Sequence, residues 1–100
     1  MATPESRVKA QCRKILDAAG AWYFFPEHMG YGRAGIPDII ACIGGRMLAV
    51  ECKAGKNKVT VLQTRELEAV HAAGGTALVI TEDTLHLLQS VVNALKEAGT

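Results

Sequence analysis

Apolar residues recur at helical spacing in three stretches of the chain, and favoured capping residues mark where helices begin and end. Thr3 is a good N-cap, Pro4 suits the first helical position, and Gly20 ends the first stretch. We therefore predict helices from Thr3 to about Ala19, from Thr60 to about Ala73 and from Glu82 to about Glu97.

Four shorter stretches carry the residue types of β-strands. Ala21–Phe25 is aromatic, and two further apolar runs lie on either side of Gly44 and Gly45. Thr76–Ile80 is almost continuously apolar, which predicts a buried strand. A strand–helix–strand connection is right-handed, so this strand should pair in parallel with Met47–Lys53. The expected fold class is α/β, in the order α-β-β-β-α-β with a C-terminal helix and a mixed sheet.

The Gly44-Gly45 pair predicts a two-residue hairpin, because both turn positions need positive φ. In that register Asp38 lies opposite Glu51, and residues opposite each other share a face of the sheet. Lys53, two residues beyond Glu51, joins the same face. The hairpin should therefore bring two carboxylates and one ammonium group together.

Such a group of charges has two explanations. Two neighbouring carboxylates can share a proton or bind a hard divalent cation such as Mg²⁺ or Mn²⁺. Alternatively, Lys53 can form an ordinary ion pair with Asp38 or Glu51 at the rim of the sheet. The surrounding residues, with Gly35 before the hairpin and Gln63 after it, favour the metal site.

These residues resemble a known signature. Gly35-Ile36-Pro37-Asp38, then Glu51-Cys52-Lys53, then Gln63 are similar to the PD-(D/E)XK nuclease motif, and in particular to the VRR-NUC family. The resemblance covers about residues 5 to 80 and is strongest to stand-alone phage and bacterial members. It implies a restriction-endonuclease-like PD-(D/E)XK core and a metal-dependent DNA endonuclease with Mg²⁺ or Mn²⁺ as cofactor.

The resemblance also implies roles for individual residues. Asp38, Glu51 and the backbone carbonyl of Cys52 would hold the ion, Lys53 would position water and offset charge, and Gln63 would orient water or phosphate. The implied substrate is branched DNA, such as a Holliday junction. A homodimer is expected on other grounds, because the short chain is almost half apolar, and the aromatic strand Trp22–Phe25 and the last helix are its candidate interfaces. A catalytically silent DNA-binding or assembly module on the same fold is the alternative function, and retention of the acids argues against it.

Three of these assignments have a plainer alternative. Glu5 matches a glutamate in the first helix of the family and would be a further metal ligand, or it is a first-turn acid favoured by the helix dipole. Gln63 has capping-box spacing from Thr60. Tyr31 and Arg33 would stack on a base and hold a phosphate, or they belong to a plain connecting loop.

Length and charge set the remaining expectations. One hundred residues predict a single domain over 1–100, and the three cysteines lack zinc-site spacing and suggest reduced thiols in the cytoplasm of a bacterium or a phage-infected cell. The sequence predicts no membrane span. The net charge is only +1, but residues 1–65 hold ten basic and five acidic residues. Lys56 and Lys58 lie in this basic part and are candidate phosphate contacts.

Overall fold

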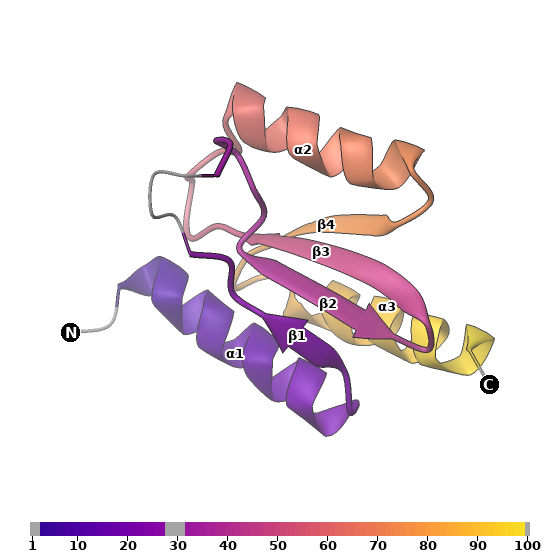
Figure 1. Ribbon diagram of the computed structural model, residues 1–100. Helices are drawn as coiled ribbons and strands as arrows, with labels where there is room; N and C mark the ends of the chain where they lie inside the picture. The colour runs from indigo at the N-terminus through magenta and orange to yellow at the C-terminus, as the bar shows by residue number, and fades with distance from the viewer. Residues whose placement is uncertain (1–2, 28–31, 100) are drawn as a thin grey trace.

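A four-stranded sheet with helices on both faces forms the fold in the computed structural model, which describes residues 3–27 and 32–99 (Figure 1). The order of helices and strands is the predicted one. The elements are α1 Pro4–Ala18, β1 Trp22–Phe24, β2 Ile39–Ile43, β3 Arg46–Cys52, α2 Val61–Ala72, β4 Thr76–Ile80 and α3 Leu85–Ala98.

The strands lie in the order β1-β2-β3-β4, with β1, β2 and β3 antiparallel and β4 parallel to β3. The predicted hairpin register is confirmed, because Ile39 pairs with Val50 and Ile43 with Arg46. Gly44 and Gly45 have φ of 58° and 76°, the left-handed conformation that a two-residue turn requires. This register fixes which side chains of the hairpin share a face.

The core lies between the sheet and two of the helices. Helices α1 and α3 cover one face of the sheet, and α2 lies on the other face (Figure 1). Alternate residues of β2 and β3 point toward α1 and α3, where they meet Leu16, Leu88 and Val92, all fully buried. In a sheet with one such core, the remaining alternate residues of β3, including Glu51, face the side of α2.

Two strand predictions need correction. The aromatic strand is shorter than expected, since β1 covers only Trp22–Phe24. The prediction that Thr76–Ile80 is buried was wrong: only Ile80 is buried, and Val79 is 38% exposed. The strand is apolar, yet it lies at the edge of the sheet, where α2 and α3 cover it incompletely.

Two cysteines meet where helix α1 packs against β3. The Sγ atoms of Cys12 and Cys52 lie 3.9 Å apart in the core, and both thiols are free. The first turn of α1 carries Glu5, which lies close to Glu51 near the end of β3 and to Lys53 just after it. Within the described residues, the longest apolar stretches of helix are too short to span a bilayer.

Candidate metal centre

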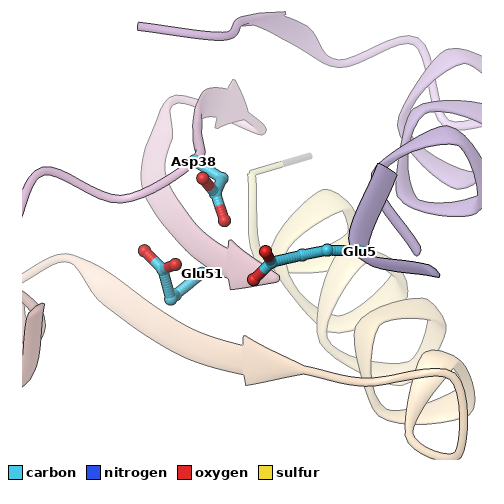
Figure 2. A group of neighbouring side chains, drawn as sticks. All are labelled: Glu5, Asp38 and Glu51. Atoms are coloured by element: carbon cyan, nitrogen blue, oxygen red, sulfur yellow. The ribbon is translucent and has the colours of Figure 1, made fainter. Parts of the chain in front are cut away.

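Three carboxylates from separate parts of the chain converge at one end of β3. Glu5 comes from the first turn of α1, Asp38 from the residue before β2, and Glu51 from β3 (Figure 2). One carboxylate oxygen of each lies within 4.8 Å of the others. The sequence predicted that Asp38 and Glu51 lie together. The structure also brings Glu5 to them, which is where a Glu5 that acts as a metal ligand would have to lie.

Asp38 is held in place by the neighbouring strand. It directly precedes the first pair of the β2–β3 ladder, so the hairpin register points it at the end of β3. Its Oδ2 atom accepts a 2.8 Å hydrogen bond from the backbone N–H of Cys52. One oxygen of the carboxylate is thereby fixed, and the other, Oδ1, faces the side of α1, where Lys9 lies.

Glu51 is the buried acid of the site. Only 1% of it is exposed, and its Oε1 atom is buried with no hydrogen-bond partner among the described residues. Burial, followed by the neighbouring Asp38 carboxylate, raises its pKa to about 8, although the ammonium group of Lys53 acts in the opposite direction. A buried acceptor without a donor is costly, so this oxygen calls for a proton or a cation.

Lys53 lies between two of the carboxylates. Its Nζ atom is 3.8 Å from Oε1 of Glu5 and 3.8 Å from Oε2 of Glu51, and its side chain is only 12% exposed. The predicted grouping of Glu51 and Lys53 is thus observed, although Lys53 lies one residue beyond the end of β3. The ion-pair alternative also holds in this structure, because Lys53 does pair with carboxylates of the site.

Gln63 forms the predicted cap and also contacts an acid of the site. Its side-chain Oε1 atom accepts a hydrogen bond from the backbone N–H of Thr60. The backbone N–H of Gln63 donates to Oγ1 of Thr60, which completes a capping box. Its Nε2 atom donates to Oε2 of Glu51 at 3.3 Å. The cap therefore fixes a side chain that also reaches Glu51, and a contact of Gln63 with water or phosphate stays a prediction.

Lys9 is a site residue that the sequence analysis missed. Its Nζ atom lies 3.5 Å from Oδ1 of Asp38. The available signal was its position four residues after Glu5, which places both side chains on one face of α1. That signal identifies a neighbour of Glu5 but not of Asp38, because the contact depends on how α1 packs against the sheet.

The candidate DNA-binding residues differ in their surroundings. Tyr31 lies outside the described residues. The side chain of Arg33 is 75% exposed, and its guanidinium group contacts Glu66 through Nε at 3.0 Å and through an Nη atom at 2.9 Å. Lys56 and Lys58 are exposed in the loop after β3.

Two grooves flank the three carboxylates. The first is lined by Pro26, Glu27, residues 32–36, Asp38 and Gln63. The second is lined by residues 3–5 and 54–57 and so contains both Glu5 and Lys56. Asp38 lines one groove and Glu5 the other, so each groove borders the group of carboxylates.

The donor set fits a hard divalent cation. The converging groups are three carboxylates, with one buried oxygen of Glu51 left without a partner. Mg²⁺ and Mn²⁺ prefer oxygen ligands of this kind, whereas softer ions favour thiolate or imidazole. The thiol of Cys52 lies in the core against Cys12, so of this residue only the backbone remains available.

Comparison with known proteins gives the chain its relatives. It is 33% identical over 90 residues to "Putative nuclease p44" of Acyrthosiphon pisum secondary endosymbiont phage 1, with 89% of this chain and 90% of the relative covered. A solved structure named "VRR_NUC domain" superposes with a TM-score of 0.69 at 25% identity, over 96% of this chain and 97% of the other. The chain belongs to the VRR-NUC nuclease family.

A second solved structure supports the VRR-NUC fold alone. The "VRR_NUC domain protein" superposes with a TM-score of 0.70 at 18% identity, over 97% of this chain and 91% of the other. A search against protein-family models matched none of them. The predicted α/β fold of the VRR-NUC type is thus confirmed by structure and the family by a sequence relative.

Proposed function

We propose that this protein is a metal-dependent DNA endonuclease that hydrolyses phosphodiester bonds with Mg²⁺ or Mn²⁺. The observation that carries the proposal is the buried, unpartnered Oε1 of Glu51 within a group of three converging carboxylates. The nuclease named in the phage relative supports the same activity. Glu5, Asp38, Glu51 and the carbonyl of Cys52 are the proposed ligands.

The remaining side chains have roles that follow from their contacts. A bound divalent ion supplies an acidic water and stabilises charge on the phosphate. Lys53, between Glu5 and Glu51, holds a positive charge beside the reacting groups and can donate a hydrogen bond to water or to a phosphate oxygen. Gln63, fixed by its cap, orients Glu51 and presents a second N–H to the same region.

The two grooves support a nucleic acid as the substrate. A strand that follows them would cross the carboxylates and pass Lys56, with Lys58 close by in sequence. Arg33 would reach phosphate if it leaves Glu66, and Tyr31 remains a candidate for stacking. Branched DNA, including Holliday junctions, is the proposed structural preference, and it rests on the family resemblance.

We propose a homodimer as the working assembly. Trp22, Phe24 and Met47 are 64%, 45% and 38% exposed, and the ladder places Trp22, Cys42 and Met47 in one row across the sheet. Large apolar groups in such a row are typical of a protein interface. Two symmetric sites would suit a substrate with two strands to cut.

A panel of labelled DNA substrates tests the activity. Duplex, flap, splayed-arm and four-way-junction DNA are incubated with Mg²⁺, with Mn²⁺ or with a chelator. We expect cleavage that requires the divalent ion, favours branched substrates and is abolished by Asp38→Ala. Cleavage by Asp38→Ala at the wild-type rate would contradict the proposed site, and tight DNA binding without cleavage under any condition would favour the silent module.

A further inference from the structure

In the absence of an ion, Lys9 and Lys53 supply positive charge beside the three carboxylates. Lys53 lies between Glu5 and Glu51, and Lys9 lies beside Oδ1 of Asp38. The two lysines differ in their freedom, since the side chain of Lys53 is 12% exposed and that of Lys9 is 40% exposed. Lys9 is therefore the ammonium group that can leave the site at little cost.

Asp38 does not need Lys9 for its orientation. Its Oδ2 atom is already held by the backbone N–H of Cys52 at 2.8 Å, whereas Lys9 lies 3.5 Å from Oδ1, beyond the distance of a strong charge-assisted hydrogen bond. The contact is thus electrostatic and loose. A divalent ion that used Oδ1 would compete with Lys9 for the same oxygen.

We propose that Lys9 exchanges partners when the ion binds: it neutralises Asp38 in the empty site, yields that oxygen to the ion, and then contacts a phosphate of the DNA. This inference rests on the proposed nuclease function and adds a residue to it. Metal binding would thereby free the ammonium group of Lys9 to contact the DNA. The metal ion and the DNA would then each strengthen the binding of the other.

The charges of the site support such an exchange. With three ionised carboxylates, one divalent ion and two ammonium groups, the site carries one positive charge in excess. That excess matches the single negative charge of one phosphodiester group. Without Lys9 the site would be neutral before DNA arrives, and the added phosphate would leave it negative.

Ion affinity without DNA is the first measurement. Calorimetry with Ca²⁺ is carried out on the wild type, Lys9→Met, Lys9→Arg and Lys14→Met, the last removing the same charge from an exposed position of the same helix. Lys9→Met should bind Ca²⁺ about three to ten times more tightly than the wild type, because a competing cation is gone. Lys9→Arg and Lys14→Met should stay close to the wild-type affinity.

The second measurement is the affinity for a four-way DNA junction with and without Ca²⁺. Gels confirm that the junction is not cleaved during the measurement. In Ca²⁺, Lys9→Met should bind more weakly than the wild type, and its salt dependence should be lower by about one counterion. Without Ca²⁺ the loss should be smaller, since Lys9 is then engaged with Asp38 and its removal deletes no contact with phosphate. Lys9→Arg should restore the wild-type response.

The outcomes separate the possible roles. Weaker or unchanged Ca²⁺ binding by Lys9→Met would overturn the exchange, and weaker binding would make Lys9 an orienting partner of Asp38. An equal loss of DNA affinity with and without Ca²⁺ would make it an ordinary phosphate contact. Lys9→Gln replaces the methionine variant if melting curves show that the latter unfolds. A wild type that binds neither Ca²⁺ nor DNA would contradict the nuclease proposal and this inference with it.

Discussion

At the scale of single residues, the raised pKa of Glu51 conflicts with its proposed role as a metal ligand unless a cation is present. Its carboxyl group is almost fully buried, and its pKa is raised to about 8 by burial and by Asp38. A carboxyl group with that pKa keeps its proton at neutral pH, yet a metal ligand must be ionised. The folded protein without metal therefore holds a proton where the proposed enzyme holds an ion.

The raised pKa of Glu51 predicts how stability without metal depends on pH. Between its ordinary value of 4.5 and about 8, the unfolded chain loses this proton while the folded protein keeps it. Stability should therefore fall as pH rises through this window, by at most about 1.4 kcal/mol per pH unit, and level off above pH 8. Thermal melting with a chelator at a series of pH values checks this.

Two variants make that measurement specific. Glu51→Gln should melt above the wild type at pH 8 and show a shallower pH dependence, because it removes the group that must ionise. Glu68→Gln, at an exposed position of α2, should follow the wild type. A wild type whose melting temperature is constant from pH 5 to pH 8 would show that Glu51 is ionised without a metal.

Lys53→Ala should separate ion binding from turnover. The ammonium group of Lys53 contacts Glu5 and Glu51 but is not itself a ligand, so Ca²⁺ affinity should change by less than about tenfold. Cleavage should fall by about a hundredfold or more, because charge stabilisation at the phosphate is lost. Calorimetry and single-turnover cleavage measure the two effects, and normal turnover at saturating Mg²⁺ would refute the role.

The sequence could predict residues that a local rule connects. The hairpin register alone placed Asp38 beside Glu51, and strand periodicity placed Lys53 on the same face. Lys9 could not be found this way, because its contact with Asp38 depends on the packing of α1 against a distant part of the chain. The partner of Arg33, Glu66, was likewise set by tertiary packing.

At the scale of whole elements, the first turn of α2 links helix formation to the site. The capping box between Thr60 and Gln63 holds the Gln63 side chain while its Nε2 atom donates to Glu51. Gly35 lies against the same turn: a Cβ atom there would be 2.4 Å from the carbonyl oxygen of Leu62, and its φ is 87°. The motif glycine thus permits the close approach of the loop before Asp38 to α2.

Two substitutions separate the cap from the site. Thr60→Ala removes the hydroxyl that accepts from Gln63 and should cost about 1 kcal/mol of stability, with little change in cleavage. Gln63→Glu keeps an acceptor for the N–H of Thr60, as glutamate does in other capping boxes, but loses the donor to Glu51. It should fold normally and cleave at least about tenfold more slowly.

Denaturant titration and cleavage rates on both proteins check this pair. The opposite result, slow cleavage by Thr60→Ala and normal cleavage by Gln63→Glu, would show that only the helix start matters. The sequence predicted the cap but could not decide whether Gln63 also reaches Glu51. Similarly, it predicted the strand Thr76–Ile80 but not its exposure, because position in the sheet is not a local property.

The loop after β3 gives a prediction for DNA binding. Lys56 and Lys58 are exposed, and Lys56 lines the groove that also contains Glu5. Lys56→Ala and Lys58→Ala should each weaken binding to all DNA sequences alike and lower the salt dependence by about one counterion. Fluorescence anisotropy over a range of salt concentrations measures both, with Lys96→Ala in α3 as the control. A loss limited to one sequence would indicate base recognition instead.

At the scale of the whole molecule, the two faces of the sheet are covered unequally. Two helices cover one face, whereas α2 lies over β3 and β4 on the other (Figure 1). The exposed row of Trp22, Cys42 and Met47, with Phe24 beside Trp22 at a ring-centroid distance of 5.5 Å, belongs to β1–β3. Sequence reasoning named this aromatic strand and the last helix as candidate interfaces without choosing between them, because neither burial nor strand order was known.

Exposure favours the sheet face as the interface of the proposed dimer. On α3, Leu87 is 47% exposed but Val91 is half-buried, so that helix offers a smaller apolar surface. Sedimentation equilibrium at micromolar concentrations should give about twice the chain mass, and Trp22→Glu should reduce it to that of a monomer, since a charge buried in an interface without a partner is costly. Leu87→Glu, the matched control, should remain dimeric.

The same variants connect assembly with cleavage. If two symmetric sites act on one junction, the Trp22→Glu monomer should make single cuts. Its Ca²⁺ affinity should stay that of the wild type, because Trp22 and the carboxylates lie at opposite ends of the strands β2 and β3. Cleavage of a supercoiled plasmid that contains a cruciform measures how tightly the two cuts are coupled. Paired cuts give linear plasmid, and single cuts give nicked circles. If the Leu87→Glu variant is the one that becomes monomeric, the interface lies on α3 instead. If the wild type is monomeric at every concentration and still makes paired cuts, the DNA itself brings two copies together.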